Sequence, residues 1–211
     1  MQNNLQDKLS TEKATNFLRA FRGQGYMNIV AIDPTNGFIN AITCDVTDNA
    51  VKKFIEQYNG NRNLHFMVNE PVRDALNKKL SKQDVTKIHG VYLDADPDKA
   101  KDFSTERKRL FSFADELAGG DNPPTYIIDS GGGIQVFWLL KDSVAATDEN
   151  IELYEALSRG LEKQYNTDSV HNIDRIMRIP FTLNIPNKQK KNAGRTEAPA
   201  LIYTDIGGRY D

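Results

Sequence analysis

The chain has 211 residues and a mass of 23.8 kDa, which is typical of one domain or of a domain with an added lobe. Mean hydropathy is −0.57 and no apolar run approaches the ~20 residues of a membrane-spanning helix, so composition excludes a membrane protein. One cysteine and three scattered histidines exclude an internal disulfide and a Cys/His zinc site. Without a secretory leader, this composition favours a cytoplasmic protein.

Hydrophobic periodicity and turn residues predict mixed helices and strands in the first half of the chain. Ser10 is suited to cap the first helix, Gly23 ends it, and a Pro-x-Asn-Gly turn at 34–37 joins two strands. In chain order we predict a helix over 10–22, strands over 27–32 and 38–43, a helix over 48–58 and a strand over 64–68. Residues 70–87 are polar, and we expect them to be partly mobile.

The second half continues this mixture of elements. In chain order we predict a strand over 91–95, a helix over 104–118, strands over 126–129 and 134–140, a helix over 148–165 and a strand over 200–203. The stretch 173–184 fits neither pattern clearly. Mixed elements that include a hairpin predict an α/β or α+β fold.

The predicted strand over 91–95 leads into two acidic residues, Asp94 and Asp96. Side chains alternate along a strand, so these carboxylates share one face, about 6.6 Å apart. Like charges so close favour a cation between them, and hard oxygen ligands suit Mg²⁺ or Mn²⁺. The alternative is a strand that ends in a polar turn, because Asp-Pro-Asp at 96–98 is typical of turns.

A Ser-Gly-Gly-Gly turn at 130–133 separates two apolar strands. Its backbone N–H groups and the Ser130 hydroxyl are suited to hold a phosphate in an anion-binding nest. Gln135 follows on the face that also carries Phe137. The sequence fits neither a Walker A loop nor a dinucleotide fingerprint, and the alternative is a flexible hairpin that uses glycine for positive φ.

Charge is unevenly distributed in the last third of the chain. Residues 171–195 contain six Lys or Arg and one Asp, a formal charge of +5, whereas 141–168 carry three basic and seven acidic residues, a formal charge of −4. Such a cluster of cations favours contact with a polyanion. Arg175 and Arg178 alternate with apolar residues, which favours rigid bidentate phosphate contacts. We expect 188–195 to be an exposed loop, and a merely solvated basic loop is the alternative.

Taken in order, the three motifs resemble the archaeo-eukaryotic primase (AEP) superfamily, in particular RepB-type primase-polymerase domains of plasmid and phage replication proteins. The stretch 174–188 is similar to the "RLPGTxNxP" signature of phage primases, and the resemblance spans residues 64–195. It implies one catalytic domain over 1–211. A smaller N-terminal α/β unit over 1–87 would join a catalytic unit over 88–211 that has an RRM-like antiparallel sheet. A helicase domain or a replicative helicase is an implied partner.

The resemblance also implies a DNA primase/polymerase that performs template-directed nucleotidyl transfer with two Mg²⁺ or Mn²⁺ ions. Its substrates would be NTPs or dNTPs, and its partners a single-stranded DNA template and a primer. The implied catalytic and metal-binding residues are Asp94, Asp96 and Asp168, with Asp174 as the alternative third ligand. The implied nucleotide-binding residues are Ser130, Gly132, Gly133, Gln135, Arg175, Arg178, Asn184 and Lys188.

Two positions depart from the family pattern. Gln135 stands where the family often has histidine, and Phe181 stands where it usually has glycine. Asp174 would instead pair with Arg178 if that stretch were helical. Two further function classes stay open. The absence of the histidine at position 135 leaves a non-catalytic initiator module that binds single-stranded DNA or nucleotide, and the acidic strand also suits a metal-dependent phosphohydrolase or nuclease.

Aromatic residues near the predicted site have two interpretations. Tyr92 shares the face of the two aspartates, and Phe137 that of Gln135, so either is placed to stack on a base. The simpler prediction is that both pack in the core. Trp138 points to the opposite face.

Overall fold

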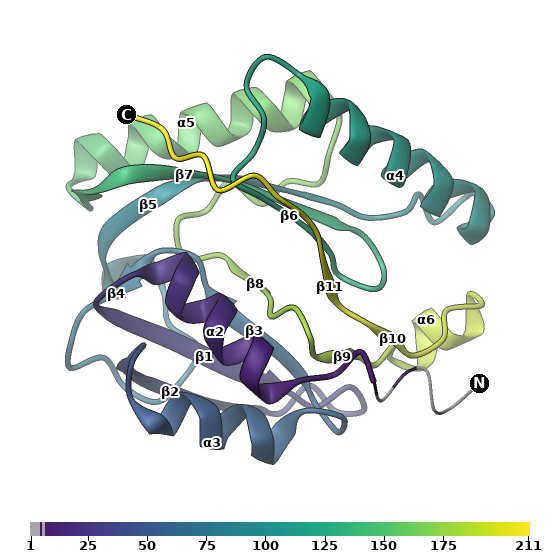
Figure 1. Cartoon of the computed structure of the whole chain (residues 1–211), viewed down its shortest axis with the longest axis horizontal. Helices are drawn as coiled ribbons and strands as arrows, with labels where there is room; N and C mark the ends of the chain where they lie inside the picture. Colours follow the sequence, from purple (N-terminus) through teal and green to yellow (C-terminus); the bar gives the residue numbers. More distant parts are fainter. Residues whose placement is uncertain (1–4, 6) are drawn as a thin grey trace.

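The computed structural model describes residue 5 and residues 7–211 (Figure 1). The helices are α2 (Thr11–Arg22), α3 (Asn49–Tyr58), α4 (Phe103–Gly119), α5 (Asp148–Tyr165) and α6 (Lys188–Asn192), with a 3₁₀ turn, η1, at Lys82–Asp84. The strands are β1 (Tyr26–Ile32), β2 (Ile39–Asp45), β3 (Asn63–Met67), β4 (Glu70–Pro71), β5 (Val85–Ala95), β6 (Tyr126–Asp129), β7 (Ile134–Ala145), β8 (Ile176–Arg178), β9 (Leu183–Asn184), β10 (Ala198–Pro199) and β11 (Leu201–Asp205). The predicted mixed class is confirmed.

The strands form two principal antiparallel sheets. A four-stranded sheet has the order β2-β1-β3-β8, and a five-stranded sheet has the order β11-β6-β7-β5-β4. Figure 1 shows α4 and α5 along one side of the five-stranded sheet and the four-stranded sheet on its other side. The predicted antiparallel core is therefore confirmed.

Side-chain alternation along β5 and β7 divides the core into two layers. Tyr92 and Phe137 are buried between the sheets, in a cluster that also holds the apolar faces of α2 and α3. Leu93 and Trp138 point the opposite way and pack beneath α4 and α5. Because Tyr92 is 2% and Phe137 0% exposed, neither stacks on a base, and the core interpretation is correct.

Side-chain caps explain why the long helices begin where the sequence predicts. The side chains of Ser10, Asp48, Asp102 and Thr147 each accept a backbone N–H from the first turn of α2, α3, α4 and α5, respectively. Such a cap satisfies a donor that the helix itself leaves unpaired. No helix in residue 5 or 7–211 is long and apolar enough to cross a membrane.

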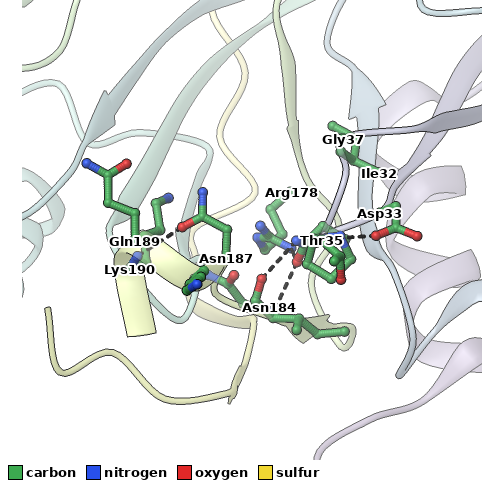
Figure 2. A pocket seen from close by; sticks show the side chains of 13 residues that line it. Ile32, Asp33, Thr35, Gly37, Arg178, Asn184, Asn187, Gln189 and Lys190 are labelled. Carbon is green, nitrogen blue, oxygen red and sulfur yellow. Dashed lines mark hydrogen bonds between the residues drawn. The ribbon is translucent and has the colours of Figure 1, made fainter. Parts of the chain in front are cut away.

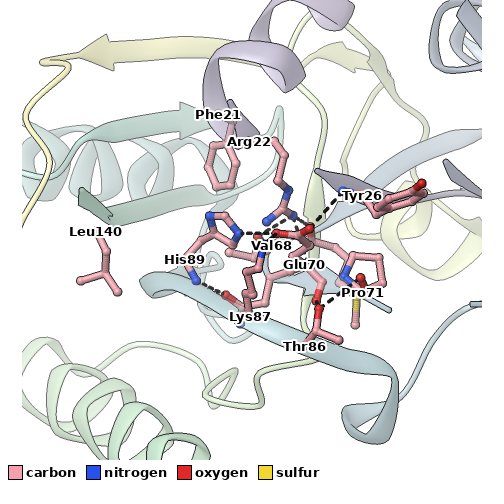
Figure 3. A network of polar contacts seen from close by, with 12 residues as sticks. Phe21, Arg22, Tyr26, Val68, Glu70, Pro71, Thr86, Lys87, His89 and Leu140 are labelled. Carbon is pink, nitrogen blue, oxygen red and sulfur yellow. Dashed lines mark hydrogen bonds and ion pairs between the residues drawn. The ribbon is translucent and has the colours of Figure 1, made fainter. Parts of the chain in front are cut away.

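The segment 70–87, which we expect to be partly mobile, contains β4 and η1, and buried groups anchor its two ends (Figure 3). The Glu70 carboxylate lies 3.3 Å from His89 Nε2 and 3.3 Å from Lys87 Nζ. Burial, followed by the nearby charges of Arg22 and Lys87, lowers the pKa of His89 to about 3, so the imidazole is neutral at pH 7. Leu80 and Val85 join a third apolar cluster.

Two short strands tie the N-terminal and C-terminal parts of the chain together. β8 pairs with β3, and β4 pairs with β5, so each principal sheet takes a strand from the other part. The boundary predicted at 87/88 falls within β5. The ambiguous stretch 173–184 consists of a turn, β8 and β9. Residues 188–192 form α6, which corrects the prediction of a loop there.

Candidate active site

Asp94 and Asp96 lie at the end of β5, where this strand leaves the five-stranded sheet. Asp94 pairs in register with Gln135 of β7, and only 18% of its side chain is exposed. The Arg175 Nη2 lies 3.2 Å from Asp94 Oδ2. Asp96 follows the strand and is 44% exposed, with its Oδ1 4.0 Å from Arg195 Nη1. The two carboxylates thus differ in burial, and each has an arginine beside it.

Asp168 joins the acidic pair through the backbone of β5. Its own N–H donates to the carbonyl oxygen of Asp94 at 3.1 Å, and its Oδ2 accepts the N–H of Asp96 at 2.8 Å. Asp174 lies in the turn before β8. Because this stretch is a turn and a strand, the helical pairing considered for Asp174 and Arg178 is wrong.

Burial and the neighbouring carboxylates both make the charged form of Asp94 unfavourable. Burial, reinforced by the negative charge of Asp96, raises the pKa of Asp94 to about 6, although Arg175 opposes this shift. Asp168 adds a further unfavourable charge. A divalent cation would relieve this repulsion, and carboxylate oxygens are the ligands that Mg²⁺ and Mn²⁺ prefer.

The hydrogen bonds of the glycine turn are largely internal. Gly131 N–H donates to Asp129 Oδ1 at 2.8 Å, and Gly133 N–H donates to the Ser130 hydroxyl oxygen at 2.9 Å. The Ser130 hydroxyl donates to Gly133 O at 3.0 Å. The turn therefore does not offer these two amides or this hydroxyl as the anion-binding nest that the glycines predict.

Close approach to β5 gives a different reason for glycine at position 133. A Cβ on Gly133 would lie 2.5 Å from the Ala95 carbonyl oxygen and 2.7 Å from Asp96 Oδ1. A Cβ on Gly132 would lie 3.3 Å from Arg195 Nη1, so this residue also packs tightly. Asn184 Nδ2 donates to the Ser130 carbonyl at 2.8 Å and anchors the turn.

Gly133→Ala is therefore expected to lower the free energy of unfolding by about 1–3 kcal/mol, because the backbone of Ala95 cannot move away cheaply. Gly160→Ala is the matched control, since its Cβ would meet nothing within 4 Å and alanine favours the interior of α5 by about 0.5–1 kcal/mol. Urea unfolding of both variants measures the difference. Equal stability of Gly133→Ala and the wild type would contradict the close approach.

Gln135 and Arg178 form one buried network. Gln135 is 5% exposed, and its Oε1 accepts the backbone N–H of Arg178 at 3.0 Å. The Arg178 guanidinium donates to Asn63 Oδ1 at 2.9 Å. Burial lowers the pKa of Arg178 to about 10, while Asp94 and Asp96 act to raise it, so Arg178 is a cation at pH 7. Gln135 thus positions β8 in this structure.

A basic pocket of about 370 Å³ opens beside this network. Figure 2 shows Arg178 and Asn184 between the β1–β2 turn on one side and the α6 segment on the other. Lys188 and Lys190 also line the pocket, and the Asn187 side chain caps α6 by accepting the Lys190 N–H at 2.9 Å. Three predicted nucleotide-binding residues therefore meet in this pocket: Arg178, Asn184 and Lys188.

Two arginines beside the glycine turn were absent from the predicted site. Arg107 of α4 lies 2.7 Å from Asp129 Oδ1 and donates to Gly133 O at 3.4 Å. Arg195 is 12% exposed, and its guanidinium lies 5.3 Å from the centroid of the Phe103 ring. The basic count of 171–195 pointed to Arg195, but no motif marked Arg107 on its helix.

His65 is a further residue that the sequence did not indicate. It pairs in register with Arg178 across β3 and β8. Burial, followed by the charges of Arg178, Arg175 and Lys190, lowers its pKa well below the ordinary value. The imidazole beside the basic pocket is therefore neutral at pH 7 and does not add positive charge.

Comparison with solved structures identifies the fold. The AEP domain of the cyanophage S-2L primase-polymerase aligns with a TM-score of 0.64, covering 97% of this chain and 95% of that domain at 18% identity. The chain has the fold of an AEP-type primase-polymerase domain. Primase RepB' also aligns, with a TM-score of 0.58 and 12% identity over 95% of this chain and 58% of the RepB' chain.

A second RepB' structure, its catalytic domain in complex with initiator DNA, aligns at a TM-score of 0.56 and 13% identity. That alignment covers 95% of this chain and 87% of the domain. No protein-family model matches the sequence, and a search of curated proteins finds no match. The likeness to these proteins therefore resides in the primase-polymerase fold.

The carboxylates of Asp94, Asp96 and Asp168 are ligands that suit divalent ions, but they do not surround a common point in this structure. Within the described part of the chain, no three His, Cys, Asp or Glu side chains converge as a metal-binding group. One oxygen of Asp168 is engaged by Asp96 N–H, and Asp94 is paired with Arg175. The raised pKa of Asp94 nevertheless indicates a cluster that a cation would stabilise.

Proposed function

We propose that the protein is a DNA primase/polymerase that joins nucleotides under the direction of a single-stranded template. The observation that carries this proposal is the position of Asp94, Asp96 and Asp168 together at the end of β5, in a primase-polymerase fold. The basic pocket beside Arg178 offers complementary charge for phosphates. We also propose the replication system of a phage or plasmid, in a bacterial cytoplasm, as its setting.

Asp94, Asp96 and Asp168 would hold two Mg²⁺ or Mn²⁺ ions. When bound, such ions activate the attacking 3′-hydroxyl and neutralise charge on the triphosphate. Arg178 would orient the triphosphate of an NTP or dNTP, and Lys188 would contact either that triphosphate or the template phosphates, since both line the pocket. Arg175 would leave Asp94 for a phosphate, because its side chain is 38% exposed and its Nε has no hydrogen-bond partner. Catalysis would then rest on positioning and charge neutralisation.

Asn184, Gln135 and the glycine turn would support this chemistry by positioning. Asn184 holds the Ser130 carbonyl, and Gln135 holds the backbone of Arg178. Gly132 and Gly133 allow the turn to approach Asp96 and Arg195 closely. Direct phosphate contact by Ser130 would require its hydrogen bond with Gly133 to exchange.

A non-catalytic module that binds single-stranded DNA or nucleotide is the second candidate. The engagement of Asp94 by Arg175 and of the turn amides by their own turn favours it, because both groups are occupied within the protein. No observation of this structure favours the phosphohydrolase or nuclease. A helicase partner belongs to the same proposal and rests on the family resemblance.

Extension of a labelled primer on a single-stranded template distinguishes the two candidates. We expect addition of template-complementary nucleotides with Mg²⁺ or Mn²⁺ and none with EDTA, and a parallel reaction without primer tests priming. Template binding without any extension, with NTPs or dNTPs and either metal, would overturn the catalytic proposal and support the binding module. Degradation of the primer would support a nuclease.

Lys188 and Lys190 are expected to contact nucleic-acid phosphates. Replacing both with alanine should weaken binding of single-stranded DNA and reduce the slope of log affinity against log salt by about 1.4, since each phosphate contact on a single strand contributes about 0.7. Lys52 and Lys53 on α3 are the matched exposed pair. Fluorescence anisotropy at several salt concentrations measures the slope, and an equal change in both double variants would contradict the assignment.

A further inference from the structure

An apolar groove of about 770 Å³ lies between α5, β7 and the C-terminal segment. Val91 and Trp138 form its floor, on the sheet face opposite Asp94 and Gln135. Tyr210 closes one side, where its N–H donates to Leu139 O at 2.8 Å. The groove therefore belongs to the face of the molecule that the proposed chemistry does not use.

Large apolar side chains remain exposed along this groove. Leu153 is 52% and Leu157 49% exposed, and they lie one turn apart on α5, beside each other on one face. Ala156 and Gly160 line the same face and would let another backbone come close. Exposed apolar residues scattered singly are ordinary, but a groove with neighbouring leucines indicates an interaction site.

The charge around the groove specifies the chemistry of a partner. Among the described residues that line it, Asp211 alone is charged, and Lys141 lies 2.8 Å from that carboxylate. On α5, exposed Glu149 lies one turn before Leu153, and exposed Glu152 lies one turn before Ala156. Exposed Asp148 adds to this charge, whereas exposed Arg159 and Lys163 follow later in α5, so the negative charge is confined to the start of the helix. A negatively charged ligand such as DNA is thereby disfavoured.

We propose that this groove binds a basic amphipathic helix of a partner protein. The partner's leucine-type side chains would fill the space over Trp138, between Leu153 and Leu157, and its lysines or arginines would face Glu149 and Glu152. An i, i+3, i+4, i+7 pattern of apolar residues suits such a groove, as in other helix-in-groove complexes. This inference does not depend on the proposed nucleotidyl transfer.

A second copy of this chain does not supply that partner helix. The helix α2 has both basic and apolar residues, but its apolar residues are already buried in the first core cluster. The basic residues 188–195 include the short α6, which has no apolar face. The exposed large apolar residues outside the groove lie in turns, strands or loops: Phe38, Leu76, Tyr203 and Ile206.

The protein carries its own reporter for the test, because Trp138 is the single tryptophan and lines the groove. The probe is a synthetic 18-residue helix with leucines three and four positions apart and lysines elsewhere, without aromatic residues. The same peptide with glutamate in place of lysine is its control. Titration of the full chain follows Trp138 fluorescence, and primer extension is measured on every variant.

We expect the lysine peptide to shift Trp138 fluorescence saturably and to bind at least tenfold more tightly than the glutamate peptide. Binding of the lysine peptide should weaken at least fivefold in each of two double variants, Leu153→Gln/Leu157→Gln and Glu149→Gln/Glu152→Gln. Leu76→Gln is the matched control, since Leu76 is 66% exposed away from the groove, and it should not change binding. Extension should be the same in all variants.

Three results would overturn the proposal. One is that the lysine peptide leaves Trp138 fluorescence unchanged, and another is that it binds Leu153→Gln/Leu157→Gln as tightly as the wild type. Dimerisation of the wild type in light scattering that Leu153→Gln/Leu157→Gln abolishes would show a second copy in the groove. Circular dichroism of each variant verifies that these exposed substitutions keep the fold, so that weakened binding reports on the groove.

Discussion

Replacing Asp168 with asparagine is expected to lower primer extension about 10³-fold, whereas Asp174→Asn should leave it within about twofold. Asparagine at 168 keeps a carbonyl oxygen to accept the Asp96 N–H, so the backbone contact survives and only the charge is lost. Loss of a carboxylate that holds a catalytic ion removes several kcal/mol of transition-state stabilisation. Asp174 instead lies in the turn before β8, where its charge acts on buried Tyr92.

The two variants are compared by their single-turnover extension rates in Mn²⁺. Binding of single-stranded DNA is the control that the fold is intact. Both variants should bind DNA at least as well as the wild type, because each removes one negative charge. A large loss in Asp174→Asn with little loss in Asp168→Asn would reverse the assignment of the third ligand.

The second large effect concerns stability and pH. The pKa of Asp94 is about 6 in the folded protein against an ordinary 3.8, so the folded state binds this proton more tightly than the unfolded state. Without metal, stability should therefore fall as pH rises from about 4 to 6, and the loss is complete above 6. The shift corresponds to about 3 kcal/mol at most.

Asp94→Asn should consequently be more stable than the wild type at pH 7.5 by about 1–3 kcal/mol in EDTA, and equally stable at pH 3.5. Urea unfolding at the two pH values measures this difference. Mn²⁺ should narrow it, because an ion that binds the folded wild type stabilises that protein alone. Lower stability of Asp94→Asn at pH 7.5 would show instead that the ion pair with Arg175 outweighs burial.

Local patterns were sufficient to predict most of the elements. Helix caps and apolar spacing are encoded within a few residues, so the predicted helix over 148–165 coincides with α5 and its Thr147 cap. Alternation along β7 likewise predicted that Phe137 and Trp138 lie on opposite faces, and they belong to different core clusters. Asp94 and Asp96 were found because they stand two residues apart at the end of a predicted strand, which places both carboxylates on one face.

What the sequence could not predict depends on contacts between distant segments. The strand β8 has three residues and exists because β3 offers it a partner, so 173–184 had no periodicity to detect. The Glu70 network that orders 70–87 needs Arg22 and His89 from elsewhere in the chain. The engagement of Gln135 by the backbone of Arg178 and the support of Gly133 by Arg107 are also long-range. In the sequence, Glu70, Gln135 and Arg107 look like ordinary polar residues.

We propose that the carboxylates at the end of β5 make this protein a template-directed polymerase. Extension of a labelled primer on a single-stranded template with all dNTPs and Mn²⁺, for the wild type beside Asp94→Ala/Asp96→Ala, tests it most directly. We predict template-complementary products from the wild type and none from the double variant at equal template occupancy. No extension by either protein with template bound, or equal extension by both, would contradict the claim.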